Sequence, residues 1–409
     1  MKRAITFTYK ALLIGIFLII LLFSGFRVKE HIQGNKYITY LENNIESVPL
    51  DNVLSFDLAD EDISDYQLIL VGEIHGFKES TKFEPEFFEY LHTTHQVNDY
   101  LIEMDMSQAY FMNKYNKTGD EEILDRVLKK WVVFIGRENE DYRKKWKSLK
   151  ELYTKYDGFT YHGNNNISDV DLLIDYINEI MKTDIDIPID QSDSVKLLSI
   201  RKAIREIDWT DSLQWEKEYI ISNIDFTINK KYREEVLTEN LANIYGHFNL
   251  EEKKVFGFYG LGHTVLSPFN DGYTAMASRF ASLVPDMKGK ILSFNFVFID
   301  SYMTTYSKSL PSFLRDKGKF TSLSVSYDNI LLSYLHGIDE LKRVTEKETK
   351  TLIKLNGKDS PYNSSRRLIS MSKVLPIGMV INGGPNQVTT DYYQYLILIR
   401  NSEGAKGIE

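Results

Sequence analysis

The sequence predicts an α/β fold with a central, mainly parallel sheet flanked by helices, a large helical insertion and an N-terminal transmembrane helix. The apolar run at 68–71 is typical of a strand that is buried on both faces, as in parallel sheets. A helical pattern and a second apolar run follow it, and strand–helix–strand in that order indicates a βαβ unit with parallel strands. The 409 residues, of which 43% are hydrophobic and 26% charged, have the composition of a globular protein.

Composition also narrows the possible functions. The net charge is -9 and no basic stripe is present, which argues against a nucleic-acid partner. The chain contains no cysteine, so disulfides, thiolate nucleophiles and cysteine-bound zinc are excluded. The absence of free thiols also suits a domain outside the cytoplasm.

The N-terminus carries the signal for topology. Lys2, Arg3 and Lys10 precede an apolar run at 11–26, and neither a small-x-small cleavage site nor a cysteine for lipid attachment follows it. We therefore predict that residues 1–29 form an uncleaved signal anchor, a single-pass transmembrane helix whose basic end stays in the cytoplasm. The folded domain would then lie on the outer side of the cell membrane. The alternative is a cleaved signal peptide and a secreted protein.

The main domain is expected at 65–300, after a linker and lead-in segment at 30–64. Its first strand spans 66–71. Residues 82–95 place apolar side chains on one face of a helix, and 100–102 form a second strand.

A helical insertion is predicted at 107–252, between the second and third strands. Its helices are expected at 107–117, 121–133, 141–156, 170–181, 194–208 and 211–248. A third buried strand at 255–260, a helix at 274–283 and a fourth strand at 290–298 complete the domain.

Residues 301–409 are expected to be a C-terminal extension that completes the same domain. The stretch 300–325 has an irregular pattern, and strands are predicted at 329–335 and 393–400. No motif in this extension indicates a function.

Ionisable residues follow the three best strand candidates directly. Glu73 and His75 follow the first strand, Glu103 follows the second and His263 follows the third. A single residue of this kind is more often structural than functional. The carboxyl ends of parallel strands, however, meet at one edge of the sheet, where ligands bind in open α/β folds. The four side chains together therefore predict a functional site at that edge.

The order of the motifs over residues 67–298 resembles the erythromycin esterase family. The matching residues are Gly72, Glu73, His75, Gly76 and Glu79, then Glu103 and Asp105, then Asn113, Tyr115 and Gly119, then Arg233, Glu234 and Asn240, and finally His263. The first motif is one residue shorter than the commonest form of the family, and this spacing resembles that of haem-binding surface lipoproteins in the same superfamily. Asn164 and Asn165 stand where the family tends to have an acidic residue, and Leu237 stands where it usually has Met.

The resemblance implies a hydrolase that acts on an ester or a lactone. His75 would be the general base that deprotonates a water molecule, and either Glu73 or Glu103 would orient it. His263 would donate to the oxyanion or to the leaving group. No serine lies in a Gly-x-Ser-x-Gly elbow, so a serine acyl-enzyme is not predicted.

The resemblance also implies substrate-binding residues, which here are Arg233, Asn240 and Glu79. Arg233 and Asn240 are seven residues apart and share a helical face. For Arg233, the alternative to binding a substrate carboxylate or phosphate is an ion pair with Glu103 or Glu79.

Two other functions stay open. Glu73, His75, Glu103 and His263 include the ligand types of Zn²⁺ and Mn²⁺, but the usual His-Glu-x-x-His helix is absent, so we predict no cofactor and keep a divalent metal as the alternative. The second possibility is a haem- or metal-binding protein of the same superfamily without hydrolytic activity. The expected partners are a small-molecule ester or lactone and, through the N-terminal helix, the membrane.

Overall fold

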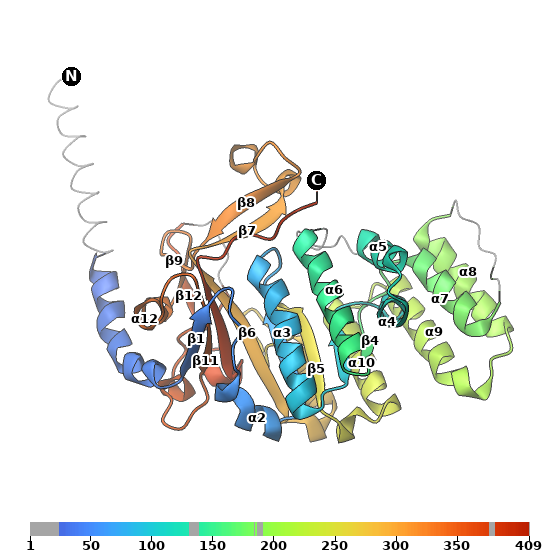
Figure 1. Ribbon diagram of the computed structural model, residues 1–409, viewed down its shortest axis with the longest axis horizontal. Coiled ribbons are helices and arrows are strands. Elements are labelled where there is room, and N and C mark those ends of the chain that lie inside the picture. The colour runs from blue at the N-terminus through green and yellow to red at the C-terminus, as the bar shows by residue number, and fades with distance from the viewer. Residues whose placement is uncertain (1–23, 131–138, 184, 186–190, 376–380, 409) are drawn as a thin grey trace.

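The computed structural model describes residues 24–130, 139–183, 185, 191–375 and 381–408. Its centre is an eight-stranded sheet in the order β1-β11-β13-β6-β2-β5-β3-β4 (Figure 1). These strands are β1 (Ile45–Pro49), β2 (Leu68–Glu73), β3 (Asp99–Ile102), β4 (Thr160–Gly163), β5 (Val255–Gly260), β6 (Ile291–Ile299), β11 (Thr349–Lys354) and β13 (Tyr395–Arg400). All neighbours from β13 to β4 pair in parallel, whereas β11 is antiparallel to both β13 and β1. The predicted mainly parallel sheet is therefore confirmed.

Helices flank the sheet, as predicted. After a first helix over 24–42, the α-helices are α2 (Asp60–Asp65), α3 (Lys78–His95), α4 (Met106–Thr118), α5 (Glu121–Lys130), α6 (Glu140–Lys155), α7 (Val170–Met181), α8 (Asp193–Glu206), α9 (Gln214–Ile228), α10 (Arg233–His247), α11 (Met276–Leu283) and α12 (Ile338–Val344). Figure 1 shows α3 and α6 side by side over one face of the sheet, and α7, α8 and α9 together beyond β4. Every residue of β2, β5 and β6 is buried, which explains why these strands are continuous apolar runs in the sequence.

The insertion between β3 and β5 is mostly helical, with two differences from the prediction. The short strand β4 lies inside it, where Asn113 binds both the N–H and the C=O of Tyr161 through its side-chain amide. The helix predicted at 211–248 is instead two helices, α9 and α10, because the chain turns at Lys230, whose φ is +51°. Both features are short. The strand has four residues and the turn has two lysines, so neither interrupts the helical periodicity of the sequence.

The C-terminal segment contains more regular structure than the sequence predicts. The stretch 300–325, predicted as irregular, forms a hairpin of β7 (Ser301–Tyr306) and β8 (Phe320–Val325) that projects from the body in Figure 1. A small sheet contains β9 (Asp328–Asn329), β10 (Ser333–Leu335) and β12 (Met371–Ser372), so the strand predicted at 329–335 is in fact two. Strand β12 pairs with β10 from far along the chain, a contact that local patterns do not encode.

The segment predicted as a linker at 30–64 is part of the folded domain. It contains the end of helix 24–42, as well as β1 and α2. Tyr37 and Leu41 of this helix are buried in a second hydrophobic core with Leu355 and Tyr362.

Most of the predicted anchor at 1–29 lies outside the described residues. Among the residues that the structure does describe, no helix has both the length and the apolar character needed to cross a membrane.

Candidate active site

A cavity of about 550 Å³ lies at the carboxyl ends of β2, β3 and β5. Its lining includes all four residues that the strand ends predict, namely Glu73, His75, Glu103 and His263, together with Arg233. The expectation that these side chains share one edge of the sheet matches the structure. Their placement agrees with the general position of ligand sites in open α/β sheets.

The two glycines around Glu73 and His75 allow close packing at this edge. A Cβ on Gly72 would overlap Asn295 Oδ1 and Thr264 Oγ1 and would come within 2.9 Å of Leu261 Cα. Gly76 has φ +90°, and a Cβ there would lie 2.5 Å from the backbone oxygen of Thr304. Glycine at position 72 therefore lets the turn that carries His263 pack directly against the end of β2.

Glu73 orients His75. The Nδ1 of His75 lies 2.9 Å from Glu73 Oε1, and because a carboxylate only accepts, the proton is assigned to Nδ1 and the lone pair to Nε2. The hydroxyl of Tyr142 donates to the same carboxylate oxygen at 2.5 Å. Glu73 is 4% exposed, so its interactions are shielded from water. The pair has the geometry of an imidazole held by a carboxylate for proton abstraction.

The carboxyl of Glu73 is ionised despite its burial. Burial alone would raise the pKa of Glu73, but His75, the Lys145 ammonium and the Tyr142 hydroxyl outweigh it and lower the pKa to about 2. Lys145 is itself buried and donates to Glu84 Oε2 at 2.8 Å. Burial raises the pKa of Glu84, although Lys145 opposes that rise.

Glu103 holds Arg233 at the cavity. Its Oε1 accepts from Arg233 Nη2 at 2.6 Å and its Oε2 accepts from the backbone N–H of Gly260 at 2.7 Å. Arg233 also donates from Nε to Asn165 Oδ1 at 3.1 Å. The carboxylate bound to Nδ1 of His75 is that of Glu73. Arg233 both forms the ion pair and lines the cavity, since its side chain remains 38% exposed.

His263 lies between two carboxylates. It ends the 3₁₀ turn Leu261–His263 after β5, with Nδ1 2.7 Å from Glu234 Oε1 and Nε2 3.8 Å from Glu103 Oε1. The other oxygen of Glu234 accepts the backbone N–H of Met276, which fixes this carboxylate at the start of α11.

The catalytic candidates surround one point. The position of a Cβ on Gly260 would be 3.3 Å from His75 Nε2 and 3.6 Å from both Glu103 Oε2 and His263 Cδ2. Because all three atoms lie within 3.6 Å of the same point, any two of them are at most twice that distance apart. A small reacting group can contact all three side chains.

Three residues of the site were not predicted from the sequence as functional. Tyr142 and Lys145 reach it from α6, and Glu234 from α10. Lys145 interrupts the apolar face that Tyr142, Trp146 and Leu149 form on α6, and this irregularity is a signal that the sequence did contain. Glu234 was part of the family resemblance, but no role followed from it.

Asn240 and Glu79, predicted to bind substrate, are not among the described residues that line the cavity. Asn240 is fully buried and donates to Asn223 Oδ1 at 2.6 Å and to the backbone oxygen of Asn164 at 3.0 Å. Glu79 is 3% exposed and pairs with Lys82 at 3.0 Å in the first turn of α3. Both side chains are therefore bound to other residues of the protein.

The two carboxylates of the site are already bound to other groups of the protein. Glu73 binds His75 and Tyr142, and Glu103 binds Arg233 and a backbone N–H. Within the described ranges, no three side chains of His, Asp or Glu come close enough together to hold a metal ion. A metal ion bound to Glu103 would have to compete with the Arg233 cation.

The sequence matches no protein-family model, and no curated protein matches it. Three solved structures share its fold. A succinoglycan biosynthesis protein has a TM-score of 0.62 at 12% identity, covering 91% of this chain and 98% of its own. A Bacillus cereus protein has a TM-score of 0.62 at 12% identity, with 92% and 99% covered. A mutant of the erythromycin esterase EreC in its open conformation has a TM-score of 0.58 at 11% identity, with 89% and 98% covered.

At this level of identity, a structural match establishes the fold and not the activity. The chain therefore has the fold of the erythromycin esterases.

Proposed function

We propose that the protein is a hydrolase of the erythromycin esterase type, in which His75 activates a water molecule for attack on an ester or lactone. The observation that carries this proposal is the pair of Glu73 and His75 at the cavity wall, with the carboxylate buried, ionised and bound to Nδ1. With the proton on Nδ1, the acceptor lone pair is on Nε2, the nitrogen that takes the proton in the proposed reaction.

In the proposed reaction, Nε2 of His75 takes a proton from water as the oxygen attacks the carbonyl carbon. The tetrahedral oxyanion accepts hydrogen bonds from Arg233 and from His263. The carbon–oxygen bond of the ester then breaks, and His75 returns its proton to the departing alkoxide. The products are a carboxylic acid and an alcohol, or a hydroxy acid from a lactone.

The experiment is hydrolysis of a panel of p-nitrophenyl esters and lactones by the full-length protein. Replacing the base, His75→Asn, is expected to lower kcat/KM by about 10²–10⁴-fold. The matched control is His247→Asn, because His247 is exposed, stacks on Trp215 and is outside the cavity lining. A His75→Asn variant that hydrolyses the panel at the wild-type rate would refute the proposal.

We also propose that the reaction needs no cofactor. The rate should be unchanged after dialysis against EDTA and should not rise when Zn²⁺ or Mn²⁺ is added back. An EDTA-sensitive rate that either ion restores would support the metal alternative instead.

Residues 1–29 are proposed to hold the enzyme at the outer face of the cell membrane, so that it acts on small extracytoplasmic esters or lactones. The basic-then-apolar order without a cleavage site supports this location. The mature N-terminus, determined by mass spectrometry of cell fractions, tests it. A mature chain that starts at or beyond Arg27 would indicate a secreted enzyme.

A further inference from the structure

One side of the cavity is an apolar wall that the C-terminal segment builds. The wall residues are Leu335, Leu368, Ile369, Met371 and Tyr393. They come from β10, from β12 and the segment before it, and from the chain before β13, and none of them belongs to a motif recognised in the sequence. The cavity thus has polar, reactive groups at one end and hydrocarbon along one side.

The surroundings of two tyrosines show how apolar this side is. Burial alone raises the pKa of Tyr327, which also lines the cavity, to about 12. Burial likewise raises the pKa of Tyr393, and its hydroxyl donates to the backbone oxygen of Leu368 at 2.7 Å. Four of the wall residues, Leu335, Leu368, Ile369 and Tyr393, are between 4% and 6% exposed.

Leu368 is held in an unfavourable backbone conformation at the wall. Its φ is +73°, a value that a bulky L-residue rarely adopts. Its N–H donates to the backbone oxygen of His336 at 2.6 Å, and its side chain packs so closely that a Cβ on Gly337 would lie 2.9 Å from Leu368 Cδ2. Such strain persists where the surrounding structure enforces it, and it is common at ligand sites.

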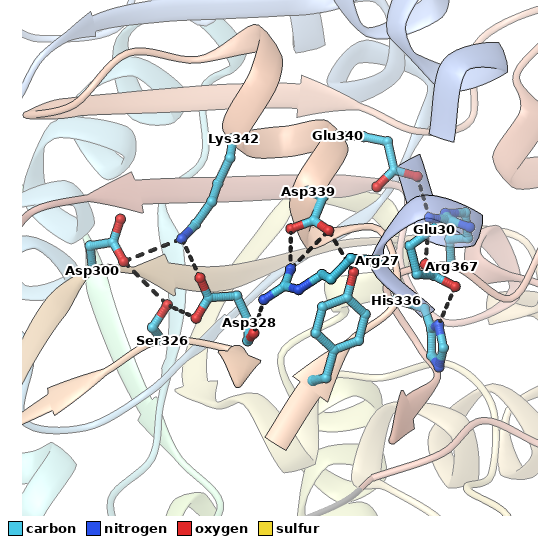
Figure 2. A network of polar contacts seen from close by, with 11 residues as sticks. Arg27, Glu30, Asp300, Ser326, Asp328, His336, Asp339, Glu340, Lys342 and Arg367 are labelled. Carbon is cyan, nitrogen blue, oxygen red and sulfur yellow. Dashed lines mark hydrogen bonds and ion pairs between the residues drawn. The ribbon is translucent and has the colours of Figure 1, made fainter. Parts of the chain in front are cut away.

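A buried polar network fixes the wall from behind (Figure 2). Glu30 of helix 24–42 is 3% exposed, and it accepts from Arg367 Nη2 at 2.8 Å and contacts His336 Nδ1 at 3.1 Å. Arg367 also pairs with Glu340. The second ring nitrogen of His336 bonds Ser372 Oγ at 2.8 Å.

Residues of this network are adjacent in sequence to residues of the wall. His336, Arg367 and Ser372 are the direct sequence neighbours of Leu335, Leu368 and Met371. In each case the polar residue is tied to the network and the apolar neighbour lines the cavity. Through His336, Arg367 and Ser372, Glu30 is therefore placed to set the positions of Leu335, Leu368 and Met371.

We propose that the apolar wall binds the hydrocarbon part of an amphiphilic ester and that Glu30 is a positioning residue for it. This inference rests on the proposed hydrolase function and adds the substrate class. A cavity of about 550 Å³ lies within the range of small-molecule sites, roughly 300–1,000 Å³. Each methylene that the wall buries should raise kcat/KM by about fourfold until the cavity is full.

The experiment compares p-nitrophenyl butyrate with the decanoate and uses the ratio of their kcat/KM values. The wild type should prefer the decanoate, by about tenfold or more. Filling the cavity with Met371→Trp should lower the ratio by about tenfold, and enlarging it with Leu335→Ala should move the optimum to longer chains. The matched control is Leu283→Trp on α11, which is 53% exposed and outside the lining, and it should leave the ratio unchanged.

Glu30→Gln tests the positioning role. It should lower the decanoate-to-butyrate ratio by about tenfold, whereas Glu30→Asp should restore part of the preference. A purely structural role would reduce turnover of both esters equally. That outcome would overturn the role of Glu30.

Binding of sodium decanoate by calorimetry separates this inference from the hydrolase proposal. If no ester is hydrolysed but decanoate binds to the wild type and less tightly to Met371→Trp, the hydrolase proposal fails and the apolar site stands. If esters are hydrolysed without chain-length preference, or Met371→Trp leaves the ratio unchanged, the apolar site fails and the hydrolase stands. If neither binding nor hydrolysis occurs, both fail.

Discussion

Glu73 stays ionised in a nearly water-free position because three neighbours stabilise its charge. Lys145 supplies positive charge, and His75 and Tyr142 each donate a hydrogen bond. An ionised partner is what an imidazole needs in order to accept a proton from water, since the carboxylate stabilises the imidazolium that forms. The four residues therefore act as one electrostatic unit.

The lowered pKa of Glu73 makes stability depend on pH. Its pKa is about 2 in the folded protein and near 4.5 ordinarily, so between these values the unfolded chain binds more protons. The free energy of unfolding should therefore fall as the pH is lowered through this window, by at most about 3 kcal/mol from this group. Urea unfolding at a series of pH values measures it.

In Glu73→Gln, this part of the pH dependence should disappear. Glu206→Gln is the control, because Glu206 is exposed and its ion pair with Lys202 is long, at 3.9 Å. Equal slopes in the wild type and Glu73→Gln would contradict the account of this carboxylate.

Local sequence predicted the strand-end residues of the site but not their supporting residues. Glu73, Glu103 and His263 directly follow apolar runs, so a pattern a few residues long is enough to locate them. Tyr142 is 69 positions from Glu73, and the contact between them depends on how α6 packs over the sheet. The hydrophobic periodicity of the sequence predicts single helices and strands, but it does not predict contacts between residues this far apart.

At the scale of elements, the turn after β5 must approach the end of β2 closely for His263 to reach the site. Gly72 permits this approach because a Cβ there would overlap Thr264 and Asn295. The central parallel strands were predictable because they are buried on both faces. The edge strand β1 is only partly buried, so its sequence lacks that signal.

Gly72→Ala should therefore reduce both stability and activity. Forced overpacking typically costs about 1–3 kcal/mol in the free energy of unfolding, and displacement of His263 should lower kcat/KM by about 10²-fold. Chemical denaturation and ester hydrolysis measure the two effects.

Gly246→Ala is the matched control. Gly246 lies inside α10, and a Cβ there would have nothing within 4 Å, so alanine should stabilise the helix by roughly 0.5–1 kcal/mol. If Gly72→Ala were as stable and as active as Gly246→Ala, the prediction that the turn after β5 must pack closely against Gly72 would be wrong.

At the scale of the whole molecule, helix 24–42 and the C-terminal segment form one unit although they are more than 300 residues apart in sequence. Arg27 binds Asp339 at 2.9 Å, and Glu30 binds Arg367 at 2.8 Å (Figure 2). The sequence predicted a separate linker at 30–64 and an extension at 301–409. Ion pairs between such distant segments leave no periodic pattern, so the sequence does not reveal that the two segments are joined.

Arg367→Met should destabilise the whole domain. It leaves the buried carboxylates of Glu30 and Glu340 without their shared cation, and breaking a buried ion pair in this way costs about 3–5 kcal/mol. The control is Arg343→Met, because Arg343 is exposed and donates to Asn35, and its effect should stay within about 0.5 kcal/mol. Similar urea midpoints for the two variants would show that the network does not join the segments.

The central claim is that Glu73 acts in catalysis only through His75, and a double-mutant cycle on kcat/KM measures this most directly. The rates of the wild type, Glu73→Gln, His75→Asn and the double variant are compared on the best ester of the panel. Residues that act as one unit are strongly non-additive. The account predicts that the double variant loses no more activity than His75→Asn alone. Losses that multiply, so that Glu73→Gln lowers the rate equally with and without His75, would contradict it.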